Sequence, residues 1–305
     1  MTDAMTDATP DTGLPPELEA WLAARLPGLD ATEDVSWPRE TSQVWRVATP
    51  TGPVFAKISP SEADHRREVY AYDNVTAAFA EHETPRLLAH DPHLRALLTS
   101  PLPGRVVRDL PLDQAAERRA HELAGHLLRR WHAHPAPDEQ QVRGQVVTAA
   151  TVQADEAARC LHRTAATLTP GQRALVARVA SDLPGLAAHL PLVYRHGDNS
   201  PRNWLWHAPP GAPGSVGLID FQMADHGAAV NDLVWLHGAL WPNRPDLRSA
   251  FLTGYGRDLT DTEQQALRLY TARLAVSYLT TGLTEDNTML VDRGRRVLDH
   301  LVHAA

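Results

Sequence analysis

The chain has 305 residues, of which 43% are hydrophobic, and carries a formal net charge of −8 at pH 7. These values are typical of a soluble globular protein with one two-lobed domain or two smaller domains. No run of 18 apolar residues is present, so no membrane span is expected, and no basic patch indicates a nucleic-acid partner.

The negative charge lies mostly near the N-terminus. Residues 1–60 carry nine acids and four bases, a net −5, whereas residues 221–305 carry ten acids and eight bases, a net −2. Residues 1–12 are acidic and repetitive and lack the apolar core of a signal peptide, so we expect a disordered tail. The single cysteine, Cys160, rules out an internal disulfide and fits a reducing cytoplasm, and we interpret it as a small buried residue of a helix.

A short helix and two strands are expected before residue 60. Residues 14–26 place their large apolar side chains on one helical face. Residues 44–47 and 54–58 read as strands, because a Pro- and Gly-containing turn separates two apolar runs. The loop 38–43 before the first strand contains no glycine, and Ser42 adds a hydroxyl there.

The second strand contains the only lysine of the chain, Lys57. The other 28 of the 29 cationic residues are arginines. A lysine ammonium is a compact point charge, whereas the planar guanidinium of arginine needs a wider site. Chance placement is the alternative, but the position inside an apolar strand favours a function for this ammonium.

The next segments predict a helix and then two short strands. The helix begins near residue 61 with a capping-box pattern, extends to about residue 80, and contains Glu68. Glu68 could pair with neighbouring arginines on a solvated face or with Lys57. Residues 86–89 and 94–99 are short apolar strands that lead into a Pro- and Gly-rich segment at 100–104, which includes Ser100 and Leu102.

Residues 113–192 are predicted to be mainly helical. In the first helix, 113–134, His132 and His134 are two residues apart and so do not share one face, which favours core packing and a helix end over a metal site. Residues 136–192 contain expected breaks at 170–171 and 184–185 and no motif to which we assign a role.

The most informative stretch is His-Gly-Asp-Asn-Ser-Pro-Arg-Asn at residues 196–203. Two apolar runs, 204–206 and 215–219, flank a Pro- and Gly-rich loop and predict a hairpin. That hairpin would bring Asn203 and Asp220 to the same end, where two oxygen ligands suit Mg²⁺, and Asp198 would stand beside the metal as a base. A metallophosphatase is the nearest alternative, but it needs a further Gly-Asn-His cluster, and Trp204 follows Asn203 here.

The C-terminal third is expected to be helical, with one helix at 230–240 that contains Asp232 and three more in 246–305. We expect most of its other acids to lie on solvated faces with arginine partners; these are Asp258, Asp261, Glu263, Glu285, Asp286 and Asp292.

The spacing Asp-x-x-x-x-Asn at 198–203, followed by Asp220 at a strand end, is that of a protein-kinase catalytic loop and its metal-binding aspartate. With His-Gly-Asp at 196–198 and Ile-Asp-Phe-x-x-Ala-x-x-Gly-x-x-x-x-Asp-Leu at 219–233, the chain resembles the aminoglycoside phosphotransferase family of small-molecule kinases. The resemblance is strong over 193–240 and weaker but consistent over about 36–134.

This resemblance implies an α/β (α+β), protein-kinase-like fold of two lobes. Residues 13–100 would form a small sheet-containing, nucleotide-binding N-lobe, and residues 101–305 a mostly helical C-lobe with the catalytic loop and the acceptor pocket. Asp198 would be the catalytic base, Asn203 and Asp220 the metal ligands, and Asp232 a structural carboxylate. Lys57, oriented by Glu68, would bind phosphates of ATP or GTP.

The remaining implied roles are less direct. Ser42 would lie in the phosphate loop, and Ser100 and Leu102 at the hinge that meets the nucleotide base, although a plain turn would look the same. Ser200 and Arg202 could touch phosphate or acceptor, and His196 would orient the catalytic loop.

The function that this resemblance implies is Mg²⁺-dependent O-phosphorylation of a small hydroxylated molecule in the cytoplasm. The acceptor could be an antibiotic, of aminoglycoside or nucleoside type, phosphorylated for resistance or self-protection. The low net charge of residues 221–305 argues against a strongly cationic acceptor. A metabolite such as choline or homoserine is an alternative acceptor. A nucleotide-binding pseudokinase with a regulatory role is the alternative from another class. No sequence pattern points to a particular oligomeric state.

Overall fold

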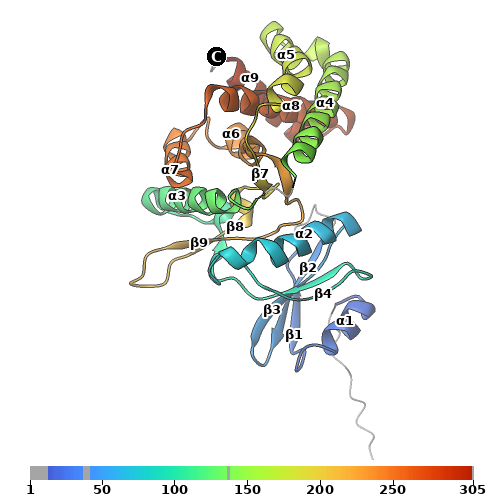
Figure 1. Cartoon of the computed structure of the whole chain (residues 1–305), viewed down its shortest axis with the longest axis vertical. Coiled ribbons are helices and arrows are strands. Elements are labelled where there is room, and N and C mark those ends of the chain that lie inside the picture. The colour runs from blue at the N-terminus through green and yellow to red at the C-terminus, as the bar shows by residue number, and fades with distance from the viewer. Residues whose placement is uncertain (1–12, 37–41, 136–137, 304–305) are drawn as a thin grey trace, which may run out of the picture. The chain divides into compact units, whose positions relative to one another are not determined.

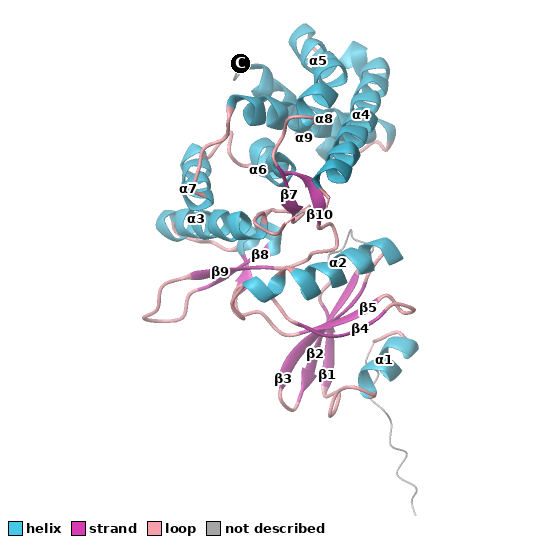
Figure 2. Cartoon of the chain, in the orientation of Figure 1, coloured by secondary structure: helices cyan, strands magenta, loops and turns pink. Residues whose placement is uncertain are grey.

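The computed structural model describes residues 13–36, 42–135 and 138–303. The chain forms two compact units, Met1–Leu102 and Pro103–Ala305. Strands dominate the first unit and helices the second (Figure 2). The expected tail at 1–12 lies outside the described residues, as does most of the predicted phosphate loop, and none of the described helices is long and apolar enough to cross a membrane.

The N-terminal unit is built on a five-stranded antiparallel sheet with the strand order β1-β2-β3-β5-β4 (Figure 1). The bounds are β1 Ala31–Asp34, β2 Gln43–Thr49, β3 Gly52–Ile58, β4 Leu87–Asp91 and β5 Ala96–Thr99. The four strands predicted from the sequence are confirmed. The edge strand β1 was not predicted, because its sequence Ala-Thr-Glu-Asp is largely exposed and lacks apolar alternation.

One face of this sheet is covered by α1 (Pro16–Ala23). Leu18, Trp21 and Leu22 of the helix are buried in one cluster with Trp45 and Val47 of β2. The predicted helix is therefore confirmed, and it is held by hydrophobic burial rather than by helix propensity alone.

The helix that contains Glu68, α2, spans Glu62–Asn74 and is followed by a 3₁₀ turn, η1, at Thr76–Ala78. Its start is confirmed, since Ser61 Oγ accepts a hydrogen bond from the Asp64 amide at 3.1 Å. The prediction that it continues to about residue 80 is wrong. The guanidinium of Arg86 donates to the carbonyls of Thr76 and Phe79, a tertiary contact that the helical pattern does not report.

The C-terminal unit combines seven α-helices, within its described residues, with two small sheets. The helices are α3 Gln114–Trp131, α4 Glu139–Thr164, α5 Pro170–Ala187, α6 Val234–Ala239, α7 Pro245–Tyr255, α8 Asp261–Thr284 and α9 Thr288–His303. The strands are β6 Arg105–Val106, β7 Leu192–Arg195, β8 Trp204–His207, β9 Ser215–Leu218 and β10 Asp225–Ala228. The three helices predicted for 246–305 are confirmed, and Cys160 is buried in α4.

Two predicted helix limits in this unit differ from the structure. A break was expected at residues 184–185, but α5 continues through Pro184, because Val179, Leu183 and Ala187 on either side of it are buried in the core. The predicted helix 230–240 is a 3₁₀ turn, η5 (Ala229–Leu233), followed by α6.

The small sheets carry the residues around the predicted catalytic loop. Strands β8 and β9 form the predicted hairpin, with Trp204 opposite Leu218, and β6 pairs with β8. Strand β7, which leads into the loop, pairs with β10. Trp204 is fully buried, so this hairpin is anchored in the core of the unit.

Helices α3 and α7 cross at two glycines. A Cβ atom on Gly125 of α3 would lie 2.1 Å from the Phe251 carbonyl oxygen, and one on Gly254 of α7 would lie 1.7 Å from the Glu122 carbonyl oxygen. Both distances are far below van der Waals contact with rigid backbone, so the two helices approach this closely only because these positions lack a side chain.

We expect Gly254→Ala to lower the free energy of unfolding by roughly 1–3 kcal/mol, because the two helix backbones must separate. Gly144→Ala is the matched control: Gly144 is exposed in α4 with no atom near its Cβ position, so this change should raise stability by about 0.5–1 kcal/mol. Urea unfolding measures both. Equal effects of the two substitutions would contradict this packing account.

Candidate active site

In the N-terminal unit, Lys57 and Glu68 form a buried ion pair. Lys57 lies on β3, and its Nζ is 2.8 Å from Oε2 of Glu68 on α2. The side chains are 11% and 2% exposed. The predicted pairing is thus confirmed, and a solvated Glu68 paired with its helical neighbours is excluded. Because burial makes an isolated charge costly, each partner keeps the other ionised and oriented.

The residues proposed at the hinge are partly engaged within the same unit. The Ser100 amide donates to the Arg86 carbonyl at 2.9 Å, and Ser100 Oγ accepts from the Arg86 amide at 2.9 Å. Leu102, the last residue of the unit, is 9% exposed. Ser42, immediately before β2, is 6% exposed. Their contact with a nucleotide stays a prediction.

In the C-terminal unit, Asp198 has two carboxylate oxygens in different surroundings. Oδ2 accepts hydrogen bonds from Arg202 Nε at 3.0 Å, Arg202 Nη2 at 2.5 Å and Asn203 Nδ2 at 2.7 Å. Oδ1 has no hydrogen-bond partner among the described residues, and the side chain is 22% exposed. Three N–H groups therefore fix one oxygen, and the other makes no hydrogen bond within the described chain.

The loop that contains Asp198 is held by the buried carboxylate of Asp232. Its Oδ2 and Oδ1 accept the amides of His196 and Gly197, each at 2.7 Å. Oδ2 also lies 2.9 Å from Nε2 of His132. Burial alone would raise the pKa of Asp232, but the hydrogen bond and the charge of His132 outweigh it and hold the pKa below its usual value.

Other side chains fix the loop from within. Asn199 donates to the Asp232 carbonyl at 3.2 Å and accepts from Trp204 Nε1 at 2.9 Å. His196 is fully buried, and its Nδ1 accepts from the Asp198 amide at 3.4 Å. Ser200 is 1% exposed, so its side chain faces the protein interior rather than solvent.

Two residues near the site have backbone conformations in the left-handed region. Gly197 has φ +84°, and a Cβ there would lie 2.0 Å from the Met223 carbonyl oxygen, so the turn before Asp198 requires glycine. Asp220 has φ +67°, a conformation that aspartate tolerates better than most side chains. Strained backbone of this kind is concentrated at functional positions.

Asn203 and Asp220 come together through the hairpin. The Ile219 amide donates a hydrogen bond to the main-chain carbonyl of Asn203 at 3.1 Å, and Asp220 directly follows Ile219 in the chain. The side-chain nitrogen of Asn203, Nδ2, donates both of its hydrogen bonds to Asp198. The side-chain oxygen of Asn203, Oδ1, is therefore the atom that is available to bind a cation. A carboxylate and an amide oxygen are hard donors that fit Mg²⁺.

The described residues contain no cluster of three or more His, Cys, Asp or Glu side chains that could hold a metal by themselves. A magnesium ion bound mainly through nucleotide phosphates does not need such a cluster, because it uses only one or two protein ligands. The donor set therefore fits a Mg–nucleotide complex and does not fit a resident metal centre.

A cavity of about 260 Å³ opens beside Asp198. Trp235 of α6 and Tyr270 and Tyr278 of α8 provide aromatic walls, and Arg273 of α8 adds a positive charge. Arg273 is paired with Glu156 of α4, and burial lowers its pKa. Among the described residues that line this cavity, the only acids are Asp198 and Asp232.

A model of the phosphotransferase enzyme family matches residues 35–270 of the chain, well over half of its length. The chain belongs to this family. The predicted resemblance is thereby confirmed, and with it the prediction that the protein is a phosphotransferase. No curated protein sequence matches the chain.

Solved structures of low sequence identity share the fold. The GDP complex of aminoglycoside 2′-phosphotransferase-IIIa matches with a TM-score of 0.67 and 14% identity over 94% of this chain and 98% of that one. The streptomycin–ATP–APH(2″)-IIa ternary complex gives 0.66 and 13% over 94% and 96%. A choline/ethanolamine kinase family protein from Mesorhizobium loti gives 0.63 and 20% over 94% and 97%. The predicted kinase-like fold is confirmed.

His132 has a role in this phosphotransferase that the sequence did not reveal. His132 follows α3, contacts Asp232 and places its other ring nitrogen 2.8 Å from the Tyr255 hydroxyl. The sequence favoured core packing for this histidine, and it is indeed buried. Its partners lie 100 and 123 residues away, so no local spacing could have identified them.

We expect Asp232→Asn to lower the free energy of unfolding by about 2–3 kcal/mol at pH 7, because buried amides lose a charged acceptor. The folded-state pKa is depressed, so this stabilisation is complete above the ordinary value of 3.8 and is lost as the pH falls through the folded value. The gap between wild type and variant should therefore close below about pH 4.

Denaturant unfolding between pH 3 and 8 measures this gap. Asp292→Asn is the control, because Asp292 is exposed on α9 and its replacement should change stability by no more than about 0.5 kcal/mol. A variant at Asp232 that is as stable as wild type at neutral pH would show that the loop is held by other contacts.

Proposed function

We propose that this phosphotransferase moves the γ-phosphoryl group of ATP or GTP to a hydroxyl group of a small molecule. The observation that carries the proposal is that the two carboxylate oxygens of Asp198 differ in their hydrogen bonding. Three N–H groups fix Oδ2, while Oδ1 faces no partner in the described chain beside a cavity of about 260 Å³. That is the arrangement expected of a general base.

In the proposed reaction, Asp198 Oδ1 accepts the proton of the acceptor hydroxyl. The acceptor oxygen then forms a bond to the γ-phosphorus while the bond from that phosphorus to the β,γ-bridging oxygen breaks, and the nucleoside diphosphate leaves with the electron pair. Arg202 and Asn203 keep the carboxylate in place during this step. We also propose Arg202 as a contact for phosphate or acceptor, whereas the buried side chain of Ser200 argues against such a contact for that residue.

In this proposal each unit has residues suited to binding part of the nucleotide. Lys57, kept in orientation by Glu68, binds the α- and β-phosphates. Asn203 and Asp220 hold Mg²⁺, which when bound neutralises charge on the transferring group. Ser42 contributes to the phosphate loop, and the hinge contact with the base would use backbone groups from the Ser100 carbonyl to Leu102, since the Ser100 amide is engaged by Arg86.

ATP and GTP are both candidate donors. One similar structure is a GDP complex and another contains ATP, and at 13–14% identity they support the class of ligand and not the choice of base. The setting that we propose is the cytoplasm, where nucleoside triphosphates and Mg²⁺ are available.

The cavity beside Asp198 favours a neutral acceptor with flat or apolar faces. Trp235, Tyr270 and Tyr278 suit stacking against a sugar or a base. A polycationic aminoglycoside needs several carboxylates, but Asp232 is already used by His132 and two amides, and Arg273 adds a positive charge. A nucleoside-type antibiotic, phosphorylated for resistance or self-protection, therefore fits better than an aminoglycoside.

A metabolite kinase remains a second candidate, and the similarity to a choline/ethanolamine kinase family protein supports it. Choline itself is a single cation that aromatic walls can bind, whereas homoserine is a smaller, zwitterionic acceptor. A nucleotide-binding pseudokinase is the alternative from another class. The presence of Lys57, Glu68, Asp198, Asn203 and Asp220 together argues against it.

We expect Asp198→Asn to lower kcat by about 10²–10⁴-fold, since the amide cannot accept the hydroxyl proton. Nucleotide affinity should change little, because Asn203 and Asp220 are intact. A coupled nucleotide-turnover assay with hydroxylated antibiotics and metabolites measures the first quantity, and calorimetry with ATP and GTP the second. Asp292→Asn should behave as wild type. Tight nucleotide binding without turnover on any acceptor would favour the pseudokinase.

We expect Lys57→Arg to lower turnover by at least about tenfold, the size of one lost charge-assisted hydrogen bond, although the positive charge is retained. The reason is that a planar guanidinium cannot reproduce the position of an ammonium 2.8 Å from Glu68. Arg46→Lys, the reverse exchange at an exposed position of β2, should leave turnover unchanged. Full activity of Lys57→Arg would mean that the single lysine is a matter of chance.

A further inference from the structure

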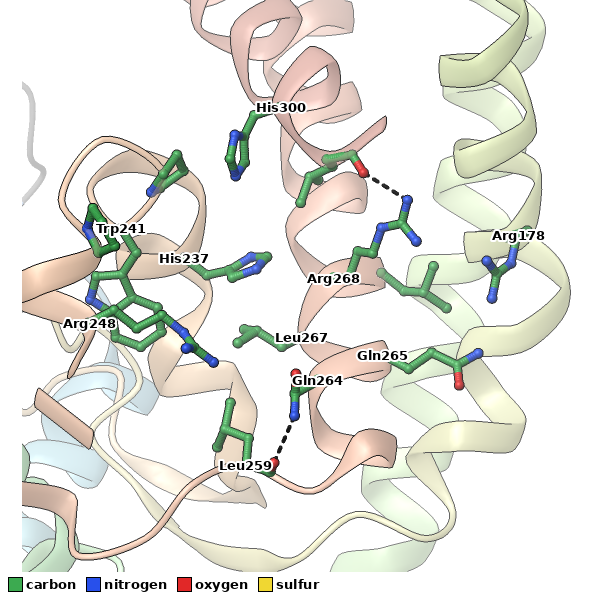
Figure 3. Close-up of a pocket in the computed structure, with 14 residues that line it drawn as sticks. Arg178, His237, Trp241, Arg248, Leu259, Gln264, Gln265, Leu267, Arg268 and His300 are labelled. Carbon is green, nitrogen blue, oxygen red and sulfur yellow. Dashed lines mark hydrogen bonds between the residues drawn. The ribbon is translucent and has the colours of Figure 1, made fainter. Parts of the chain in front are cut away.

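A cavity of about 750 Å³ in the C-terminal unit shares no lining residue with the loop that contains Asp198. It is bounded by residues of α5, α7, α8 and α9 and by His237 and Trp241 of α6 and the turn after it (Figure 3). It shares no lining residue with the cavity beside Asp198. Its size is within the range of pockets that bind small organic molecules.

The charged side chains that line this cavity are all basic. Arg178 comes from α5, Arg248 from α7 and Arg268 from α8, and two histidines, His237 and His300, join them. Among the described lining residues none is acidic. In Figure 3, Arg268 reaches towards the side on which Arg178 lies, and His237, Arg248 and His300 lie on the other side of α8.

Two of the three arginines lack a carboxylate partner. Arg268 donates only to the Leu301 carbonyl, at 2.7 Å, and its buried Nε has no acceptor among the described residues. For the Arg248 side chain, the described part of the chain offers no hydrogen bond or ion pair. Arg178 differs, because its Nε donates to Asp182 on its own helix at 3.1 Å.

Nearby carboxylates are already engaged elsewhere. Asp299, next to His300, accepts a hydrogen bond from Gln172 at 2.8 Å. Glu263 of α8 is bound bidentately by Arg257, with both contacts at 2.7 Å. Of the three lining arginines, only Arg178 is therefore paired with a carboxylate within the described chain.

Burial and neighbouring positive charges lower the pKa of two of these side chains. Burial, followed by the charges of His300, Arg248 and Arg268, lowers the pKa of His237 to about 4. Burial and the charge of Arg178 lower the pKa of Arg268. Arg248 and Arg268 are half-buried, so water screens part of the repulsion between like charges, and an anionic ligand would replace that repulsion with attraction.

The polar donors are combined with apolar walls. Trp241, Leu259 and Leu267 are buried side chains that line the same cavity, and Trp241 Nε1 has no acceptor within the described chain. An inorganic ion has no apolar part that could pack against these side chains. Guanidinium groups recognise carboxylate and phosphate oxygens in a bidentate manner.

We propose that this cavity is a binding site for a small organic anion that carries phosphate or carboxylate groups, with Arg248 and Arg268 as its principal ligands. The site is separate from the proposed transfer reaction and does not depend on it. Because α6 and α8 line both cavities, a ligand here would contact the same two helices that form the acceptor side of the catalytic site.

The test uses the full chain with labelled histidines and follows the ring resonances of His237 and His300 by NMR. Pyrophosphate and citrate are titrated separately as phosphate and carboxylate probes. These resonances report on the cavity alone, so pyrophosphate bound at the nucleotide site does not interfere. We expect saturable shifts with at least one probe, and the probe that gives them identifies the anionic group that the site prefers.

The matched variants are Arg248→Gln, Arg248→Gln combined with Arg268→Gln, and the control Arg296→Gln on the exposed face of α9. We expect about tenfold weaker binding for each lining arginine removed and unchanged binding in the control. The single variant keeps the test valid if the double variant does not fold, because the Arg248 side chain makes no hydrogen bond or ion pair within the described chain. Shifts that do not saturate with either probe, or equal affinity in wild type and Arg248→Gln, would overturn the proposal.

Discussion

The buried carboxylate of Asp232 is the interaction on which the catalytic half of the molecule depends. It receives two main-chain amides of the catalytic loop and a ring nitrogen of His132, so one ion connects the loop, the end of α3 and the 3₁₀ turn η5. An ion in the protein interior is stable only if hydrogen bonds replace its lost water. Here those same bonds determine where Asp198 lies, so the stability of the Asp232 carboxylate and the position of the proposed base have a single cause.

A second constraint is the use of paired charges to orient single functional atoms. Arg202 and Asn203 immobilise one oxygen of Asp198, and Glu68 immobilises the ammonium of Lys57. In both cases a flexible side chain is held in one orientation by hydrogen bonds or an ion pair within the protein. Preorganisation of this kind lowers the loss of conformational entropy that substrate binding must offset.

The two cavities of the C-terminal unit differ in whether their charged side chains are paired with opposite charges. Beside Asp198, each charged group has a partner, as Arg273 has Glu156, and aromatic side chains provide the remaining walls. In the larger cavity, Arg248 and Arg268 have no carboxylate in the described chain. This contrast is why we assign a neutral acceptor to the first cavity and an anionic ligand to the second.

The sequence by itself determined those features that depend on short-range spacing. The interval from Asp198 to Asn203, the hairpin that leads to Asp220 and the strand around the only lysine could all be predicted, because residue periodicity and turn composition act locally. The sequence left two partners open for Glu68, neighbouring arginines or Lys57; the resemblance favoured Lys57, and the structure shows that pair.

Only the tertiary structure decided which distant groups meet. The contact of His132 with Asp232 joins residues 100 positions apart, and Arg86 ends α2 from outside the helix. The packing of Leu183 carries α5 through Pro184 against its local preference. The basic cavity gathers side chains from five helices, none of which shows an unusual pattern by itself. Such features depend on packing contacts made throughout the whole unit, and no short stretch of sequence specifies those contacts.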